Sequence, residues 1–421
     1  MAHKTANKIG RRSVLKGAAA GVALGALGGT AFAAPRPVKI GLVGTKTGGL
    51  AVFYEGMPYV IDLIKKEIGS SIEVAGAKHP YEILFRDSES NPNHASNVAQ
   101  DLIFNEKVDL MLTWSGPSTV HPVSDQCEAN GVPCISTVDP LDTYFFGRGA
   151  PKHGFDWTYN FFWNGAEYSH ACIGAWNQLK TNKVIGGLWP NNAAGEAHAR
   201  TAPPILKKAG FTVVDAGRFD LPSNYTAQIA AFKSHQVEIV QGVMPPPQFT
   251  LFWNAAAQQN FKPKAVIMLQ SAEFAAGLIP LGARAYGLAA DIWWSPAYPY
   301  RSKRTGISSK QLADGYENAA GKPWVMPLGM YHALFEVAFD ALGKAAALKP
   351  AAIRDAIRSN RYDTTVGPID FRKGPFPNTS ATPEVLGQWW KGKKFPLTPL
   401  VESNTLYPHI PLQAEFRPIS Y

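Results

Sequence analysis

The chain has 421 residues, of which 17% are charged and 46% hydrophobic, and it carries a net charge of +9. This length allows two or three domains, and the composition excludes a disordered chain. No run of about 20 apolar residues follows the first 33 positions, which excludes a polytopic membrane protein. Residues 1–33 hold five basic residues and no acidic one, so the remainder carries only +4. It has no basic block with interleaved aromatic residues, and we expect no nucleic-acid partner.

The first 33 residues have the pattern of an export signal. A basic region contains Arg11 and Arg12, a stretch rich in Ala, Gly and Leu follows, and the small-x-small sequence at 31–33 predicts cleavage after Ala33. The Arg pair with Leu15 and Lys16 downstream resembles a twin-arginine signal. A general secretory signal and an uncleaved anchor are the alternatives. No Cys stands at the cleavage point, so we expect a mature protein free in the periplasm and not embedded in the membrane.

Strands and helices are predicted to alternate along most of the chain. The apolar runs are mostly continuous, as in strands covered on both faces, and helical stripes such as Met57, Val60 and Ile64 lie between them. Asn91 followed by Pro92 predicts a helix start. This alternation predicts an α/β fold built from open, parallel, doubly wound sheets. The predicted strands are 38–43, 81–86, 108–113, 134–136, 183–189, 211–214, 237–243 and 265–269.

The alternation is interrupted at residues 140–159 and 295–306, which are rich in Gly or Pro and lack an apolar period. Each interruption separates one series of strands and helices from the next. The simplest architecture is therefore two doubly wound lobes with a cleft between them. Two helices, at 328–348 and 350–360, follow the second interruption, and the Pro-rich tail from residue 374 is predicted to edge the second lobe.

The sequence offers no signature of catalysis or of a cofactor. The loop at 44–50 lacks the Lys of a phosphate loop, and HExxH, CxxC and GxSxG are absent. Glu167 and His170 form at most half of a di-metal site, and a solvent-facing pair is the simpler interpretation. Cys127 and Cys134 either form a disulfide in the oxidising periplasm or are two small buried thiols. We expect no enzyme, no cofactor and no metal.

The order of these segments resembles a known family, the type I periplasmic solute-binding proteins of ABC importers, in the group for branched-chain amino acids and amides. The resemblance covers about residues 38–370. It implies two lobes that close on a small ligand, with three crossings between them. Lobe 1 would be 36–157 plus 293–361, and lobe 2 would be 158–292 plus 362–421, after a signal at 1–33. The segments that carry it are VKIGLVGTKTG at 38–48, RDSESNP at 86–92, GVPCIS at 131–136 and KKAGFTVV at 207–214.

In open parallel sheets, ligands bind beyond the carboxyl ends of the strands. The loop after the third predicted strand opens a helix, and free N–H groups at a helix start attract anions. The resemblance implies that this loop holds a ligand carboxylate, although a hydroxyl there could merely cap the helix. Gln270 stands where the family has a carboxylate, with Glu273 one turn away. The candidate ligand-binding residues are Phe53, Trp114, Ser115, Ser118, Thr119, Thr137, Asp139, Trp189, Asn192, Met244, Gln270 and Trp294.

The resemblance implies a periplasmic substrate-binding component of an ABC importer. Its partners would be a small-molecule ligand and an inner-membrane permease. The ligand is expected to be a small polar organic solute, with an aromatic or other carboxylate, an amino acid and an amide as the alternatives. The position of Gln270 argues against an α-ammonium group, because an unpaired buried ion is costly. A periplasmic ligand-sensing receptor on the same fold is the alternative function.

Overall fold

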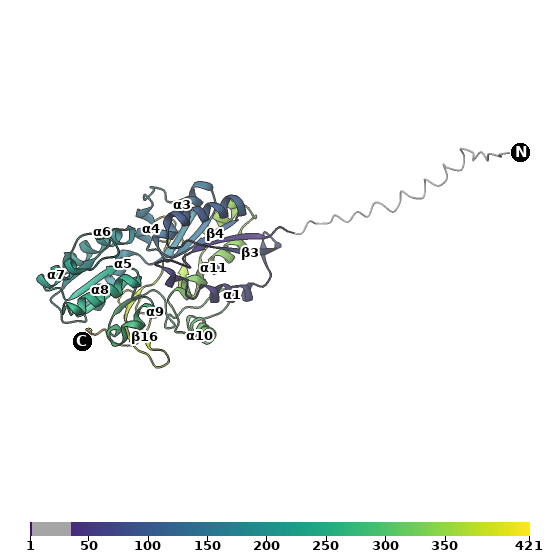
Figure 1. Ribbon diagram of the computed structural model, residues 1–421. Coiled ribbons are helices and arrows are strands. Elements are labelled where there is room, and N and C mark those ends of the chain that lie inside the picture. The colour runs from purple at the N-terminus through teal and green to yellow at the C-terminus, as the bar shows by residue number, and fades with distance from the viewer. Residues whose placement is uncertain (2–34) are drawn as a thin grey trace. The chain divides into compact units, whose positions relative to one another are not determined.

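In the computed structural model, seven-stranded sheets form the centre of each half of the molecule (Figure 1). The structure describes Met1 and residues 35–421. The first sheet has the order β14-β6-β5-β4-β1-β3-β2, and all its pairs are parallel except β2–β3. Its strands are β1 (Val38–Gly44), β2 (Ser71–Val74), β3 (Ala77–Asp87), β4 (Leu110–Thr113), β5 (Cys134–Thr137), β6 (Thr158–Phe162) and β14 (Thr379–Ala381).

The second sheet has the order β16-β15-β11-β10-β9-β7-β8. Its strands from β8 to β11 are parallel, whereas β15 and β16 are antiparallel additions at one edge. A separate hairpin joins β12 (Tyr362–Thr364) to β13 (Gly367–Ile369). The strands of the second sheet are β7 (Val184–Leu188), β8 (Thr212–Asp215), β9 (Ile239–Val243), β10 (Ala265–Leu269), β11 (Ala289–Ile292), β15 (Val385–Lys391) and β16 (Leu397–Ser403).

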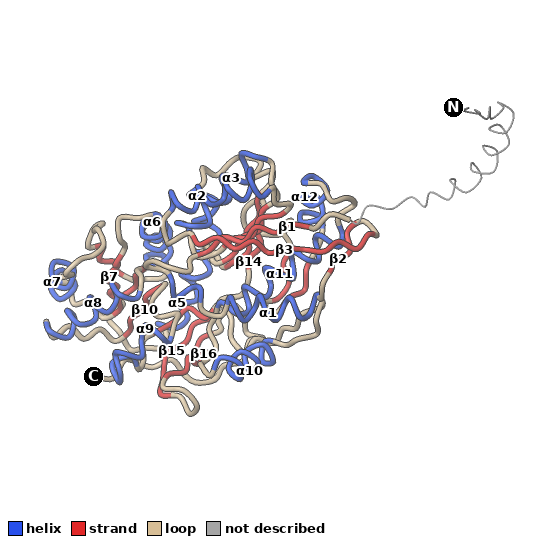
Figure 2. The backbone as a smooth tube through the Cα atoms, turned by 45° about the vertical axis from the view of Figure 1, so that its right-hand side comes forward, coloured by secondary structure: helices blue, strands red, loops and turns tan. Residues whose placement is uncertain are grey.

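Helices cover both sheets, as the continuous apolar strands require (Figure 2). In the first half, α2 and α3 pack together on β1 and β4, and α11 packs with α1. In the second half, α5 packs on β15 and β16 and α6 on β8 and β9. The α-helices are α1 (Met57–Ile68), α2 (Pro92–Asp101), α3 (Pro117–Asn130), α4 (Leu141–Gly147), α5 (Gly165–Trp176), α6 (Ala193–Lys208), α7 (Thr226–Ser234), α8 (Pro246–Gln258), α9 (Ala275–Leu278), α10 (Ser309–Ala320), α11 (Pro327–Lys344) and α12 (Pro350–Ser359).

The predicted fold class is confirmed: two sheets dominated by parallel strands are flanked by helices. The Asn91 cap is present, because its side chain accepts the N–H groups of Asn93 and His94, and Pro92 opens α2. None of the helices in residues 35–421 is long and apolar enough to span a membrane. The predicted export signal at 1–33 lies outside the described residues.

Two strands belong to the first sheet, although the expected lobe boundaries assign them to lobe 2. β6 (Thr158–Phe162) and β14 (Thr379–Ala381) pair with each other in the first sheet, although both ranges were expected in lobe 2. The chain therefore leaves the first sheet after Phe162, not before Thr158. The reason is that the segment 140–159 is not a plain crossover: it forms α4 and then runs into β6, which lies between β5 and the edge strand β14. All three cysteines are buried free thiols, which agrees with the second alternative for Cys127 and Cys134.

Candidate functional site

Two adjoining cavities lie where loops from both sheets meet. The inner cavity, of about 40 Å³, has room for only a few water molecules. The outer cavity, of about 550 Å³, shares Pro117, Ala194 and Gln270 with it. The inner cavity is lined by Phe53, Gly116, Pro117, Val138, Pro140, Thr143, Phe162, Trp163, Ala194, His198, Val243, Leu269, Gln270 and Glu273. The outer cavity is lined by Gly49, Leu50, Ser90, Pro92, Pro117, Ser118, His121, Pro122, Asn192, Ala193, Ala194, Pro245 and Gln270.

The cavities lie beyond the carboxyl ends of parallel strands, as the fold rule predicts. Val138 follows β5, and Gln270 follows β10 of the other sheet. Both residues, and Ser115 after β4, have positive φ angles, of 57°, 68° and 92° respectively. Residues other than Gly rarely adopt this backbone conformation, least of all a β-branched residue such as Val138. Strained backbone of this kind clusters at functional sites, and here it occurs where three strands end beside the cavities.

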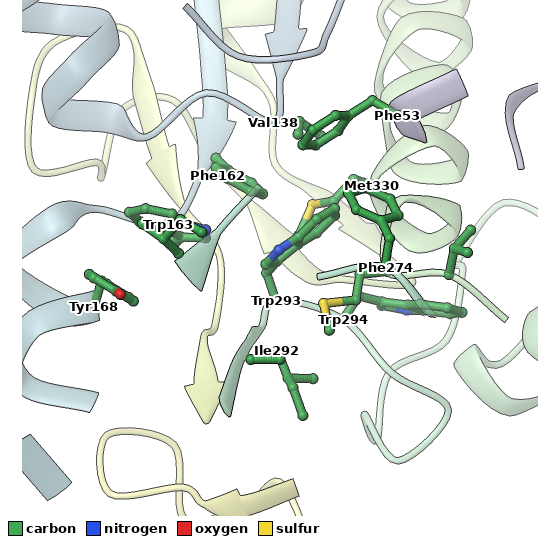
Figure 3. Close-up of a cluster of buried hydrophobic side chains, with 14 of the residues drawn as sticks. Phe53, Val138, Phe162, Trp163, Tyr168, Phe274, Ile292, Trp293, Trp294 and Met330 are labelled. Atoms are coloured by element: carbon green, nitrogen blue, oxygen red, sulfur yellow. The ribbon is translucent and has the colours of Figure 1, made fainter. Parts of the chain in front are cut away.

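Aromatic rings bridge the two sheets around the inner cavity (Figure 3). Phe53, from the loop after β1, meets Phe274 of the second half edge-on, with ring centroids 4.8 Å apart. Phe162 at the end of β6 contacts Trp293, which follows β11, at 5.2 Å. Trp163 stacks on Tyr168 at 5.3 Å. These pairs are well within the range of favourable ring contacts, so they hold the two halves together as well as lining the space between them.

Four of the predicted ligand-binding residues line a cavity. Phe53 lines the inner one, Ser118 and Asn192 line the outer one, and Gln270 lines both. The Asn192 side chain also caps α6 by accepting the N–H of Gly195 at 2.9 Å. Gln270 also donates its backbone N–H to Glu273 Oε1 at 2.6 Å. Ligand contact by these four stays a prediction.

The other predicted residues have partners within the protein and line neither cavity. The Ser115 hydroxyl accepts the N–H of Thr45 at 3.3 Å, and the hydroxyls of Thr119 and Ser88 are 2.9 Å apart. Thr137 donates to the carbonyl of Phe161 at 2.8 Å. Asp139, fully buried, forms an ion pair of 3.0 Å with His121. Trp114, Trp189, Met244 and Trp294 are buried core side chains.

Three ring-bearing residues of the inner cavity, Phe162, Trp163 and His198, are among the lining residues that the sequence did not predict. Phe162 ends β6 and Trp163 follows it. The Gly- and Pro-rich segment before β6 concealed this strand, and the four aromatic residues within 159–163 were the available signal. His198 lies on α6 beside the stacked rings of Trp163 and Tyr168, with ring centroids 6.2 and 5.8 Å away. Burial lowers the pKa of His198 to about 4, against the opposing effect of Asp142, so its imidazole is neutral at pH 7.

Within residues 35–421, no group of three His, Cys, Asp or Glu side chains is placed to hold a metal ion. Glu273 is the acidic residue of the inner cavity. Burial raises its pKa to about 8, although the N–H of Gln270 works in the opposite direction. What the arrangement offers a ligand is thus an aromatic and aliphatic wall with a few polar groups, which is the usual make-up of a small-molecule site.

The chain belongs to the periplasmic binding protein family, whose sequence model matches residues 37–382. The fold is similar to that of several solved structures at low sequence identity. The leucine binding protein LivK of Thermotoga maritima is 17% identical, with a TM-score of 0.73, covering 86% of this chain and 97% of its own. A solute binding protein of an ABC transporter from R. palustris, in complex with 4-hydroxybenzoate, is 16% identical (TM-score 0.71; 87% and 96% covered). LivJ of Streptococcus pneumoniae, in complex with isoleucine, is 14% identical (TM-score 0.70; 87% and 99% covered).

Proposed function

We propose that this protein is the periplasmic substrate-binding component of an ABC importer. It captures a small polar organic solute between its two sheets, without converting it chemically, and presents it to a membrane permease. The observation that carries the proposal is the inner cavity, which residues after β1, β5 and β6 line from the first sheet and residues at the end of β9 and after β10 line from the second. A ligand held from both sides stabilises the closed arrangement, because only that arrangement makes all of its contacts.

The small volume of the inner cavity fits a closed form without ligand. Opening the two halves enlarges it by separating Phe53 and Phe162 from Phe274 and Trp293. The solved relatives support this use of the fold, since two are complexes with an aromatic acid or an amino acid. The alternative function, a ligand-sensing receptor, shares the binding step but not the transport step.

The test is a thermal-shift screen of organic acids, amino acids, amides and amines, followed by small-angle scattering with each solute that raises Tm. A ligand at 100 times its Kd adds about 2.7 kcal/mol to the free energy of unfolding. We expect a bound solute to reduce the radius of gyration. Ala194→Trp, which fills both cavities, should abolish binding, whereas Ala230→Trp on the exposed side of α7 should not.

Uptake of that solute by cells with and without the gene then separates transport from sensing. Loss of uptake on deletion supports the importer, and unchanged uptake supports the receptor. Binding that survives Ala194→Trp would contradict the location of the site.

A further inference from the structure

The inner cavity is bordered by one carboxyl group and by no permanent positive charge. Glu273, 6% exposed, is its acidic residue, and none of the residues that line either cavity is a Lys or Arg. His198 is the other ionisable group of the inner cavity, and it is neutral at pH 7 because burial lowers its pKa. A charged ligand in this space therefore meets a carboxyl group before it meets any cation.

Two more carboxyl groups lie behind Glu273. Asp291, on β11, is fully buried, and Glu384, which precedes β15, is 1% exposed. All four of their carboxyl oxygens lack a hydrogen-bond partner, and within residues 35–421 no basic side chain forms an ion pair with Glu273, Asp291 or Glu384. Buried charges are ordinarily paired. Burial raises the pKa of Asp291, and the charges of Glu273 and Glu384 raise it further, which shows that the three groups act on one another.

Most of the groups at the start of α3 that should receive a ligand carboxylate are engaged elsewhere. Pro117, the first residue of α3, has no N–H, and the N–H groups of Thr119 and Val120 both donate to the carbonyl of Gly116. The hydroxyls of Ser115 and Thr119 bond to Thr45 and Ser88. From this helix start only Gly116, whose N–H donates to the carbonyl of Val138, and Pro117 line the inner cavity, whereas Ser118 lines the outer one. The helix start therefore offers the inner cavity no anion site, although helix starts in general favour anions.

The walls of the inner cavity also favour a cation. Phe53, Phe162 and Trp163 present ring surface to it, and ring faces attract ammonium groups, most strongly when water is excluded. Trp163 stands against Tyr168 (Figure 3), so its ring is held in place. We propose that the cleft selects a small organic solute carrying a protonated amine and no carboxylate, and that Glu273, backed by Asp291 and Glu384, receives the amine. This inference rests on the proposed solute-binding function and names its substrate class.

Proton linkage predicts how the affinity for an amine depends on pH. Glu273 must lose its proton to pair with an ammonium group, and its pKa in the empty protein is about 8. The groups that face it are Asp291 on β11, Glu384 before β15 and the hydroxyl of Tyr331 on α11, with His198 of α6 across the cavity. Burial raises the pKa of that hydroxyl far above 10. Amine binding therefore releases about one proton at pH 7, and the affinity rises with pH.

The experiment is isothermal titration calorimetry of the full-length mature protein with two matched pairs of probes: benzylamine against benzoate, and isopentylamine against isovalerate. We expect each amine to bind more tightly than its acid. The Kd of the amine should fall about tenfold from pH 6 to pH 7. The binding enthalpy, compared in buffers of different ionisation enthalpy, should show that about one proton is released. Glu273→Gln should weaken amine binding at least tenfold, and Glu82→Gln, an exposed residue of β3, should leave it unchanged.

Tighter binding of either acid, an amine affinity that does not rise with pH, or no amine binding at all would overturn the proposal. The pH series uses the wild-type protein, so it decides the question even if Glu273→Gln does not fold. An acid that binds and reduces the radius of gyration would overturn the amine preference and still support the solute-binding function.

Discussion

The hydroxyl of Thr201 on α6 donates a hydrogen bond of 3.3 Å to Asp142 Oδ2 on α4. The bond connects a helix beside the second sheet to the helix that precedes β6 of the first. The other oxygen of Asp142 accepts the N–H of Gly165, the first residue of α5, at 2.7 Å. One carboxylate thus links three helices near the inner cavity, and Arg200 of α6 lies 5.6 Å from the ring centre of Phe146 on α4.

Thr201→Val removes this bond at nearly constant shape. A single hydrogen bond to a charged group is worth about 1.5–3 kcal/mol at best, and a bond as long as this one is worth less. We expect the closed form to lose about 1 kcal/mol, so that the ligand-free protein shows a larger radius of gyration in small-angle scattering. Thr250→Val is the matched control, because that hydroxyl bonds to Pro246 within α8. Equal radii for Thr201→Val and wild type would show that the bond does not hold the two halves together.

The buried carboxyl groups predict how the stability of the ligand-free protein depends on pH. Burial raises the pKa values of Glu273, Asp291 and Glu384 in the folded protein. A folded state that binds protons more tightly than the unfolded chain gains stability as pH falls. For Glu273 this contribution is complete below about pH 4.5 and is lost as pH rises through about 8.

Denaturant unfolding between pH 5 and pH 8 should therefore show the higher free energy of unfolding at pH 5. Asp291→Asn should flatten this slope and raise the stability at pH 8, because the buried carboxyl can no longer ionise there. Asp314→Asn, at an exposed position on α10, is the control. His198 works in the opposite direction below pH 6.5, since its lowered pKa favours the unfolded chain there. A wild-type slope of the opposite sign would contradict the assignment.

A second buried group predicts a loss of stability in alkali. His332 on α11 is fully buried, with Nδ1 2.9 Å from Glu336 and Nε2 3.4 Å from Glu67 on α1. Burial alone would lower its pKa, but the charge of Glu336 and the hydrogen bonds to both carboxylates raise it to about 9. The stability it contributes is complete below about pH 6.5 and is lost as pH rises through about 9.

His332→Gln should remove most of the difference in unfolding free energy between pH 7 and pH 10. That difference is on the order of 2–3 kcal/mol, since each pKa unit corresponds to about 1.4 kcal/mol. His235→Gln, at an exposed position after α7, should leave it unchanged. Chemical unfolding at the two pH values measures both, and an unaltered difference in His332→Gln would mean that the imidazole is not charged in the folded protein.

The sequence was most informative where burial alone decides the structure. The strand at 265–269 was predicted with the bounds of β10, because every one of its residues is apolar and covered on both faces. β6 was missed because Gly147, Gly149, Pro151 and Gly154 precede it. The antiparallel strands β15 and β16 were missed because Pro residues around them indicate loops.

The site was harder to predict than the fold. A strand end identifies the loop but not the direction of each side chain, so Ser118 and Gln270 reach a cavity whereas Thr119 and Thr137 turn to partners within the protein. Glu384 is 111 residues from Glu273 along the chain, and only the return of the tail to the second sheet brings them together. Contacts of such sequence separation leave no local pattern.

The remaining prediction concerns the predicted export signal at 1–33, which lies outside the described residues. The export receptor recognises the Arg pair of a twin-arginine signal itself, and positive charge alone does not replace the pair. Replacing Arg11 and Arg12 with Lys keeps the charge and removes the recognised Arg pair, so the precursor should accumulate in the cytoplasm. Lys16→Arg, which keeps both the charge and the pair, should be exported normally. Fractionation followed by immunoblotting measures both, and a normal periplasmic yield of the Lys-Lys variant would instead assign the chain to the general secretory route.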